Sequence, residues 1–243
     1  MAQAIRLFER GVRVFVGRLY NHDYLWFSSH EMSKVSTTQP YLHNYALCYA
    51  LAQRSHRLCV GSVPKYVEDA QGEFNAMPLY CTPAQTSSVH RTTITFNALD
   101  DLTQTTGDSG SMNTPNLGKR VYLNLLWERL DAERPKLGYE FYCFAFDGFT
   151  LPGAFRLGKK GAPVRVRWEE LPQAVAHFRE RSERPTHLVN PLDINGRIVS
   201  YDPIAIPPHL LLRMAIIEQD WFVFGGRHSL QVPKRVLARI GGV

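Results

Sequence analysis

The chain has 243 residues, of which 44% are apolar and 21% are charged, and 28 Lys and Arg residues against 22 Asp and Glu residues give a net charge of +6. This composition excludes wholesale disorder, and the length suits a single domain over residues 1–243, since domains typically hold about 100 to 200 residues. No apolar run approaches the roughly 18 residues of a membrane span, and Arg6, Glu9 and Arg10 interrupt the N-terminal segment before a signal peptide could form. We therefore expect a cytoplasmic protein whose positive charge permits a polyanion as partner.

The first predicted elements are a strand, a second strand paired with it, and a helix. Residues 12–16 alternate with period two, with valines on one face and Arg13 and Phe15 on the other. Residues 24–28 form an aromatic run after a short polar turn, and we expect the two to pair as a hairpin. Pro40 opens a helix through residue 51, because Tyr41, Tyr45 and Tyr49 recur at helical spacing.

Two predicted insertions follow. Residues 58–84 contain prolines and a turn-like Asp69–Gly72 stretch, which indicates a protruding hairpin. Residues 103–116 contain one apolar side chain, Met112, so this polar loop is either a binding loop or disordered. The sequence does not choose between these alternatives, and residues 120–130 are ambiguous between helix and strand.

The C-terminal half is predicted to be rich in strands. In residues 164–168, two valines and Trp168 face one way while Arg165 and Arg167 face the other, which predicts a strand with one apolar and one positive face. We further expect strands at 139–146 and 221–224, helices at 171–181 and 207–218, and a hairpin in which Asn195 and Gly196 join 192–194 to 197–199. Strands and helices in this mixed order indicate an α+β fold with an antiparallel sheet and a β-rich C-terminal part.

No pattern for metal or cofactor chemistry is found. The chain lacks a Walker-type phosphate loop and G-x-G-x-x-G, and His30-Glu31 has no histidine four residues after His30. The four cysteines form no C-x-x-C pair, so we expect Cys48, Cys59, Cys81 and Cys143 to be reduced and mostly buried. Ser109 lies in a Gly-Asp-Ser-Gly stretch of the polar loop and is not expected to be a nucleophile.

Basic side chains lie among aromatic residues and glycines on the predicted strands. Examples are Arg13 beside Phe15, Arg165 with Arg167, and the loop from Arg156 to Gly161. Such a surface can follow a phosphate backbone while aromatic rings stack on bases. The alternative is an ordinary basic sheet edge, protected from aggregation by its charges.

Residues 39–51 favour the RNA-binding surface over the ordinary basic sheet edge. They closely resemble the "PYLHNYAL-x-YAL" signature of the Csc1 family, the Cas5-type subunit of type I-D CRISPR Cascade complexes. Three further blocks agree in order: residues 80–84, residues 155–159, and residues 190–193 together with Pro207 and Pro208.

The resemblance implies a RAMP-superfamily fold, with an RRM-like, ferredoxin-like core and a protruding thumb hairpin at residues 58–84. It implies a non-catalytic subunit without cofactor that caps the 5′ handle of the guide RNA (crRNA). The backbone subunit and the large subunit of the complex would be its protein partners. Contact with target DNA near the flanking motif is left open.

The RNA-binding residues are carried over from the matching blocks and their basic surroundings. The helix block supplies Tyr41, His43 and Asn44, although its tyrosines are expected to pack on the sheet, leaving His43 and Asn44 to reach RNA or the backbone. The remaining candidates are Arg156, Gly158, Lys159, Lys160, Arg165 and Arg167. The thumb has a net charge of minus two, from Lys65 against Glu68, Asp69 and Glu73, which favours wedging between bases or contact with a neighbouring subunit over phosphate binding.

Two rival hypotheses remain. The first is a metal-independent endoribonuclease that processes CRISPR repeat RNA with His43 as general acid or base, although a buried helix gives such a base poor access to a 2′-hydroxyl. The second is a scaffold that touches only protein.

Overall fold

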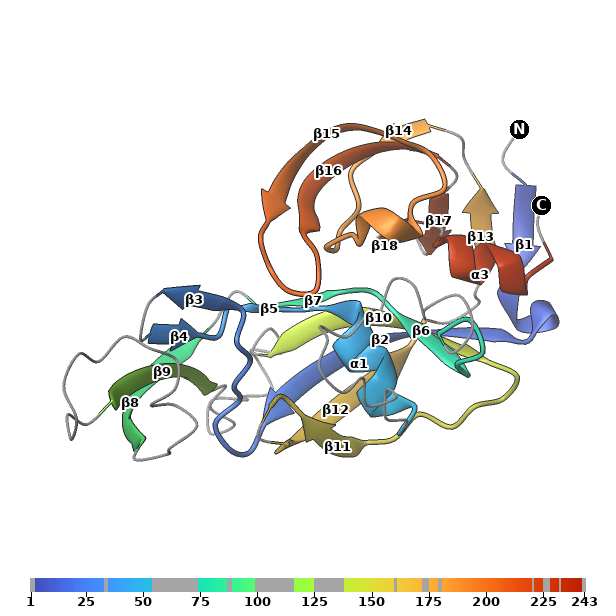
Figure 1. The fold of residues 1–243 in the computed structure, drawn as a ribbon. Coiled ribbons are helices and arrows are strands. Elements are labelled where there is room, and N and C mark those ends of the chain that lie inside the picture. The colour runs from blue at the N-terminus through green and yellow to red at the C-terminus, as the bar shows by residue number, and fades with distance from the viewer. Residues whose placement is uncertain are drawn as a thin grey trace.

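The structure is a computed structural model that describes residues 3–32, 35–53, 74–86, 89–98, 116–124, 138–159, 161–171, 175–178, 181–219, 221–224, 228–231 and 233–241. These residues form a strand-rich α+β fold with few helices (Figure 1). The predicted fold class is therefore confirmed at this level.

A seven-stranded sheet forms the centre of the molecule. Its strands, in spatial order, are β11 (Ala154–Leu157), β12 (Ala162–Glu170), β2 (Val12–Asn21), β10 (Tyr139–Phe146), β7 (Ala84–Gln85) and β5 (Tyr41–Leu42), and β6 (Leu79–Cys81) also pairs with β10. All of these pairings are antiparallel.

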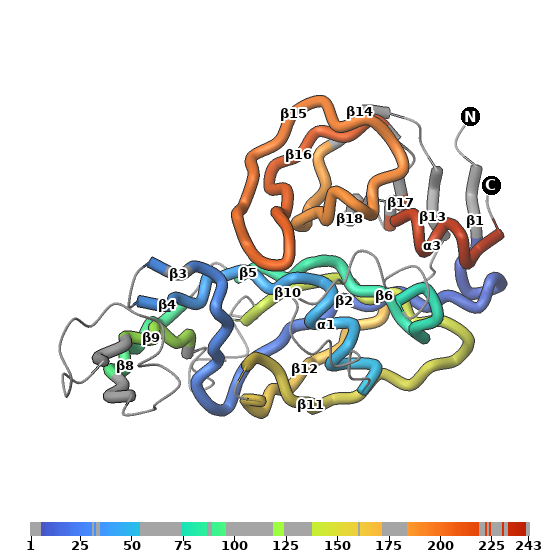
Figure 2. Tube along the Cα trace, in the orientation of Figure 1, coloured from blue at the N-terminus to red at the C-terminus, as the bar shows by residue number. Residues whose placement is uncertain are grey.

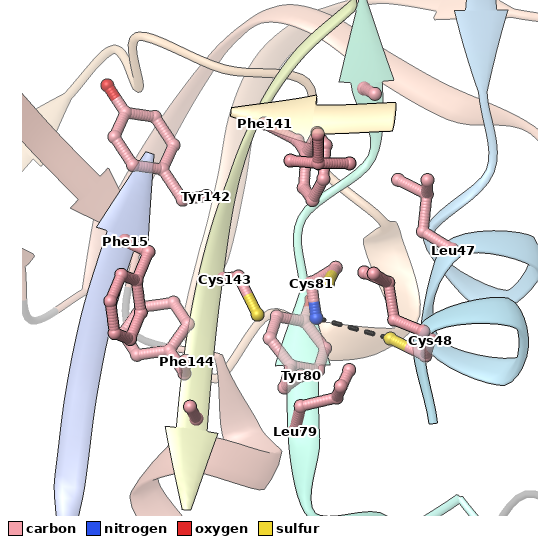
Figure 3. Close-up of a cluster of buried hydrophobic side chains, with 14 of the residues drawn as sticks. Phe15, Leu47, Cys48, Leu79, Tyr80, Cys81, Phe141, Tyr142, Cys143 and Phe144 are labelled. Atoms are coloured by element: carbon pink, nitrogen blue, oxygen red, sulfur yellow. Dashed lines mark hydrogen bonds between the residues drawn. The ribbon is translucent and has the colours of Figure 1, made fainter. Parts of the chain in front are cut away.

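One face of this sheet packs against helix α1 (Asn44–Leu51), and we call it the helix face. Directly opposed residues project to the same side of a sheet, so Phe15 of β2 shares this face with Cys143 of β10. Cys143 is in turn opposite Cys81, whose backbone N–H donates to the sulfur of Cys48 in α1 at 3.2 Å (Figure 3). Burial raises the pKa of the Cys81 thiol well above its ordinary value.

These three cysteines are free and buried, as predicted. Cys59 lies outside the described residues.

The opposite face, which we call the outer face, is covered over one part and open over another. Val12, Val14 and Val16 are buried on it, and Phe144 packs there against Phe222 with ring centroids 6.0 Å apart. Along β12, by contrast, the alternating residues on this face are exposed.

Four smaller sheets surround the central one. They are β1 (Gln3–Arg6) with β13 (Val175–Phe178); β14 (Arg181–Glu183), β16 (Leu211–Gln219) and β15 (Arg197–Ile204); β17 (Trp221–Phe224) with β18 (His228–Gln231); and β3 (His30–Met32), β4 (Val35–Thr37), β9 (Asn116–Asn124) and β8 (His90–Ala98). The β15–β16 pair curls into an open half-barrel above the central sheet, and β8 and β9 lie at the end of the molecule far from both termini (Figures 1 and 2). The remaining helices are η1 (Leu7–Arg10), η4 (Pro191–Asp193) and α3 (Lys234–Arg239).

Several predicted strands are confirmed. The strands at 139–146 and 221–224 coincide with β10 and β17, and residues 12–16 lie within β2. In β12, Val164 and Val166 are buried while Arg165 and Arg167 are exposed, which is the predicted alternation.

Two predicted helices are wrong. In the described part of residues 171–181 the chain forms β13 and the start of β14, and residues 211–218 belong to β16. Strand β13 pairs with β1, and β16 pairs with both β14 and β15; such tertiary pairing overrides local helix signals. The helix predicted from Pro40 begins at Asn44, because the His43 side chain caps it and Tyr41 pairs in β5.

Two predicted hairpins are also wrong. Residues 191–193 form η4, capped by the Asn190 side chain, and β15 pairs with β16 instead. Leu25 does not pair with β2 but forms an isolated bridge with Leu123, with both N–H to O distances at 3.0 Å.

The predicted insertions are described only in part. Residues 74–84, the described end of the predicted thumb, include Phe74, Met77 and Leu79, all buried in the core. Residues 58–73 and 103–115 lie outside the described residues, and Asn116 is the first residue of β9. The ambiguous stretch from residue 120 is a strand as far as Asn124, and 125–130 are outside.

Candidate functional site

A pocket of about 540 Å³ brings the two most distinctive sequence blocks together. Its wall includes five of the nine predicted RNA-binding residues: Tyr41, His43, Arg156, Gly158 and Lys159. Further wall residues come from α1, from residues 27–29 and from Ile206, Pro207 and Pro208. Most of this wall is apolar or aromatic, and a volume of this size is within the range of about 300 to 1,000 Å³ found for small-molecule sites.

His43 is a buried, neutral member of the wall. Its Nδ1 accepts the backbone N–H of Tyr45 at 3.4 Å, which caps α1. Burial, with a smaller contribution from the nearby His209, lowers the pKa of His43 from 6.5 to about 3. Because Nδ1 acts as an acceptor, the neutral ring carries its proton on Nε2.

Two residues of the wall also carry buried polar atoms whose hydrogen bonds are not satisfied. Nε2 of His43 and the hydroxyl of Ser29 are both buried, and neither has a hydrogen-bond partner among the described residues. The His43 ring is also in edge contact with His209, with centroids 4.5 Å apart. A buried donor without an acceptor costs about 1 to 3 kcal/mol, so these two atoms lower the stability of the fold locally.

The rim of the pocket is a tight glycine turn between β11 and β12. Gly158 adopts a left-handed φ of 82°, and a Cβ there would lie 2.8 Å from the carbonyl oxygen of Trp26. The same oxygen accepts the backbone N–H of Lys159 at 3.0 Å. Gly158 is one of the predicted RNA-binding residues, and in the structure it lets the turn dock on the backbone of Trp26.

Two cations flank the Trp26 ring beside this turn. The Lys159 ammonium lies 5.1 Å from the ring centroid, and the Arg120 guanidinium lies 4.5 Å from it. Cation–π contacts of this kind are worth roughly 0.5 to 2 kcal/mol. They hold exposed Lys159 close to the pocket rim.

Arg156 lines the pocket and also lies on the outer face of the central sheet. It contributes to the pocket wall, and its guanidinium donates to the Gly161 carbonyl at 2.9 Å. It also lies opposite Pro163, so the strand register places its side chain on the outer face with Arg165 and Arg167. Arg156 therefore connects the pocket rim to the outer face.

The open part of the outer face carries a group of arginines, which we call the arginine patch: Arg18, Arg156, Arg165 and Arg167. Arg167 lies opposite Arg18, and Arg18 pairs with Glu169 at 2.9 Å and Glu140 at 3.3 Å. Arg165 and Arg167 are exposed and form no ion pair with any described residue. The patch therefore keeps a local positive excess although Arg18 is neutralised.

Asn44 is placed differently from the other helix candidates. It is completely buried, its amide donates to Asp193 at 3.1 Å, and its oxygen accepts from Asn190 at 3.1 Å. Asp193 also accepts from Tyr80 at 2.8 Å and pairs with Arg235 of α3 at 3.1 Å. Asn44 thus belongs to a buried polar network that joins α1 to the C-terminal helix.

Arg13 and Phe15 do not offer the expected cation and stacking ring. The guanidinium of Arg13 forms two hydrogen bonds with Glu170, at 2.9 and 2.6 Å. Phe15 is buried against Trp168, with ring centroids 6.2 Å apart. Phe15 is therefore not an exposed stacking ring, and Arg13 is exposed but paired with Glu170.

Lys160 lies outside the described residues. Ser29, Trp26 and Arg18 were not singled out from the sequence. Arg18 continues the alternation of β2 and could have been found by extending that strand, whereas nothing local marks Ser29.

Within the described ranges, no group of three or more His, Cys, Asp or Glu side chains could hold a metal ion. None of the helices in the same ranges is long and apolar enough to cross a membrane.

Comparison with known families gives a match over nearly the whole chain. The model of a family described as type I-D CRISPR-associated protein Cas5/Csc1 matches residues 12–239. The match covers the pocket, the arginine patch and the buried network. No curated protein matches the chain.

Proposed function

The chain belongs to the type I-D CRISPR-associated Cas5/Csc1 family, and from this premise we propose that it is a non-catalytic subunit of a type I-D surveillance complex that binds and caps the 5′ handle of the guide RNA. Its central sheet would be the RRM-like core of a RAMP protein. Its partners would be the backbone subunit and the large subunit, which it helps to position for recognition of target DNA in the cytoplasm.

The convergence of the two sequence blocks on one pocket carries this proposal. Residues 41–43 and 156–159 are more than a hundred positions apart, yet they share a wall. The pocket is mostly apolar, while Lys159 and Arg156 at its rim are exposed and cationic. An aromatic cavity with a cationic rim suits single-stranded RNA, whose bases stack and whose phosphates need positive charge.

The arginine patch supports a path for the sugar-phosphate chain beyond the rim. Arg156 connects the two surfaces, and Arg165 and Arg167 extend the positive charge along β12. Guanidinium groups bind phosphate in two-pronged fashion, so exposed arginines in a row suit a backbone that carries one charge per nucleotide.

The surroundings of His43 favour binding over cleavage. A general base works best when its pKa lies near the operating pH, and burial lowers the pKa of His43 to about 3. At neutral pH this ring is therefore a weak base and a poor proton donor. We propose that His43 caps α1 and takes no part in proton transfer.

A footprint of the guide RNA tests the proposal. Complexes reconstituted with this subunit should protect the riboses of the 5′ handle from hydroxyl radicals, and complexes reconstituted without it should leave them open. The same footprint in both would contradict handle binding.

Incubation of the purified protein with repeat RNA in EDTA tests the absence of catalysis. We expect intact RNA. Specific fragments that disappear in the His43→Ala variant would instead identify the protein as a metal-independent ribonuclease.

A further inference from the structure

Three cysteine side chains meet in the core between the central sheet and α1. Cys48 lies on α1, Cys81 on β6 and Cys143 on β10, and the side chain of Cys143 points toward β6 (Figure 3). All three are completely buried, and none of them lines the pocket. The fold therefore gathers three thiols at a place that the proposed function does not use.

The strand register brings two of these thiols into position for a disulfide. Cys81 and Cys143 lie directly opposite each other in the β6–β10 pair. At the next position, the backbone N–H of Thr82 donates to the carbonyl of Tyr142 at 2.9 Å. Since hydrogen-bonded positions alternate with non-hydrogen-bonded ones, the two cysteines form a non-hydrogen-bonded pair, in which the Cα atoms lie about 4.5 Å apart. A disulfide needs a Cα separation of about 4.4 to 6.8 Å, so a bond between these thiols fits the strands as they stand.

The third thiol is held at the other edge of β6. In a non-hydrogen-bonded pair the backbone N–H points away from the paired strand. The N–H of Cys81 accordingly donates to the sulfur of Cys48 at 3.2 Å. Cys48 is thus an acceptor for the backbone of β6, whereas Cys143 is the cross-strand neighbour of the Cys81 side chain.

Burial protects the pair from oxidation while β6 stays in the sheet. It raises the pKa of the Cys81 thiol well above its ordinary value, so the reactive thiolate is scarce. Strand β6 is only three residues long, and in the described sheet it pairs with β10 alone. Local opening of such a short edge strand costs less free energy than global unfolding, and it would bring Cys81 to solvent.

Contacts from the C-terminal part of the chain hold β6 in place. The hydroxyl of Tyr80 in β6 donates to Asp193 of η4 at 2.8 Å. Arg239 of α3 donates to the carbonyls of Asn75 and Met77, just before β6, at 3.1 and 3.3 Å. Loss of the contacts with α3 should therefore make opening of β6 easier.

We propose that Cys81 and Cys143 are a latent disulfide site, which small disulfide compounds oxidise when β6 opens and which the contacts with α3 otherwise protect. The Cys81 thiolate attacks the small disulfide, which forms a mixed disulfide and releases one thiolate. The Cys143 thiolate then attacks the sulfur of Cys81 and displaces the second thiolate. The two cysteine protons pass to the released thiolates, so two cysteines are oxidised while one small disulfide is reduced to two thiols. The new bond ties β6 to β10 and closes residues 82–142 into a loop.

Oxidation of the full-length chain with 4,4′-dithiodipyridine tests the inference. The Cys59→Ser variant is used, because Cys59 lies outside the described residues. With one equivalent of reagent, we expect both thiopyridone groups to be released, no adduct on the protein, and one peptide that joins Cys81 to Cys143. Cys48→Ser keeps an acceptor for the Cys81 N–H and should give the same product. A link between Cys48 and Cys81, or stable adducts without a cross-link, would overturn the inference.

The rate of oxidation tests the protection by α3. Arg239→Ala removes hydrogen bonds from a charged group and should speed oxidation about tenfold. Arg213→Ala is the matched control, because Arg213 bonds to Asp202 and Tyr41, and it should leave the rate unchanged. In urea, the logarithm of the rate should rise less steeply than that of the global unfolding constant, because local opening exposes less surface. An unchanged rate in Arg239→Ala, or equal urea slopes, would refute protection by α3, and neither result depends on RNA binding.

Discussion

The two faces of the central sheet carry different kinds of polar group. On the helix face, the polar groups of residues in the pocket wall, such as His43 and Ser29, are neutral and buried. On the outer face, the arginine patch presents charged and exposed groups such as Arg165 and Arg167. The aromatic surface of the pocket suits stacking on a base, and a solvated guanidinium suits a phosphate. Under the proposed function, the two faces of one sheet would separate base contact from backbone contact.

The largest expected effect concerns the buried polar network that joins α1 to α3. Asp193→Ala would leave Arg235 without its carboxylate and remove the acceptor of Tyr80 and Asn44. Breaking a buried ion pair costs about 3 to 5 kcal/mol, so we expect a loss of this size in the free energy of unfolding, measured with urea. The control Asp202→Ala breaks the exposed pair with Arg213 and should cost at most about 1 kcal/mol. Equal losses in the two variants would show that the buried network has no special role.

A pH titration distinguishes the neutral face from the charged one. The pKa of His43 is about 3 in the folded protein against 6.5 ordinarily, so the unfolded chain binds a proton that the folded state excludes. The stability due to this difference is complete above pH 6.5 and is lost as the pH falls toward 3, with a slope of up to about 1.4 kcal/mol per pH unit. His43→Asn should therefore flatten the decline in unfolding free energy below pH 6.5. A double variant of Arg165 and Arg167 to Ala should leave it unchanged, and the opposite pattern would contradict the account.

Substitutions in the glycine turn between β11 and β12 test whether its docking on the Trp26 carbonyl matters for stability and for RNA binding. Gly158→Ala places a side chain 2.8 Å from the Trp26 carbonyl in a left-handed conformation, whereas at Gly161 the conformation is also left-handed but the nearest atom is 3.8 Å away. The left-handed conformation itself costs about 1 to 2 kcal/mol. We expect both variants to pay this cost and Gly158→Ala to lose more stability and also RNA affinity. Equal effects would mean that the docking on Trp26 is unimportant.

Salt dependence separates backbone contacts from base contacts. Each phosphate bound by a single strand contributes about −0.7 to the slope of log affinity against log salt. Arg165→Ala with Arg167→Ala should flatten that slope by one to two units, and Arg156→Ala with Lys159→Ala should do the same. An unchanged slope in either double variant removes that pair from the phosphate path.

The elements predicted correctly are those whose structure follows from the spacing of neighbouring apolar and polar residues. The alternation in β12 and the aromatic run of β10 indicated strands and faces correctly. Residues 207–218 were misread because prolines and apolar spacing favour a helix locally, while pairing with β15 decides the structure. His43 was predicted to lie inside the helix, but it precedes α1 and its side chain caps the helix.

The candidate site was predictable only as a set of residues. The matching blocks supplied Tyr41, His43, Arg156, Gly158 and Lys159, which the fold brings to one pocket. Their meeting depends on the order of strands in the sheet, and the unsatisfied hydroxyl of Ser29 depends on burial. Neither property can be inferred from the spacing of nearby residues.

Site-specific cross-linking tests the central claim most directly. A guide RNA with 4-thiouridine at successive positions of its 5′ handle is assembled into the complete complex and irradiated, and the cross-linked peptides are identified by mass spectrometry. The account predicts cross-links from the handle to peptides that contain residues 41–43 and 156–167 of this chain. Cross-links from every handle position to other subunits alone would contradict it.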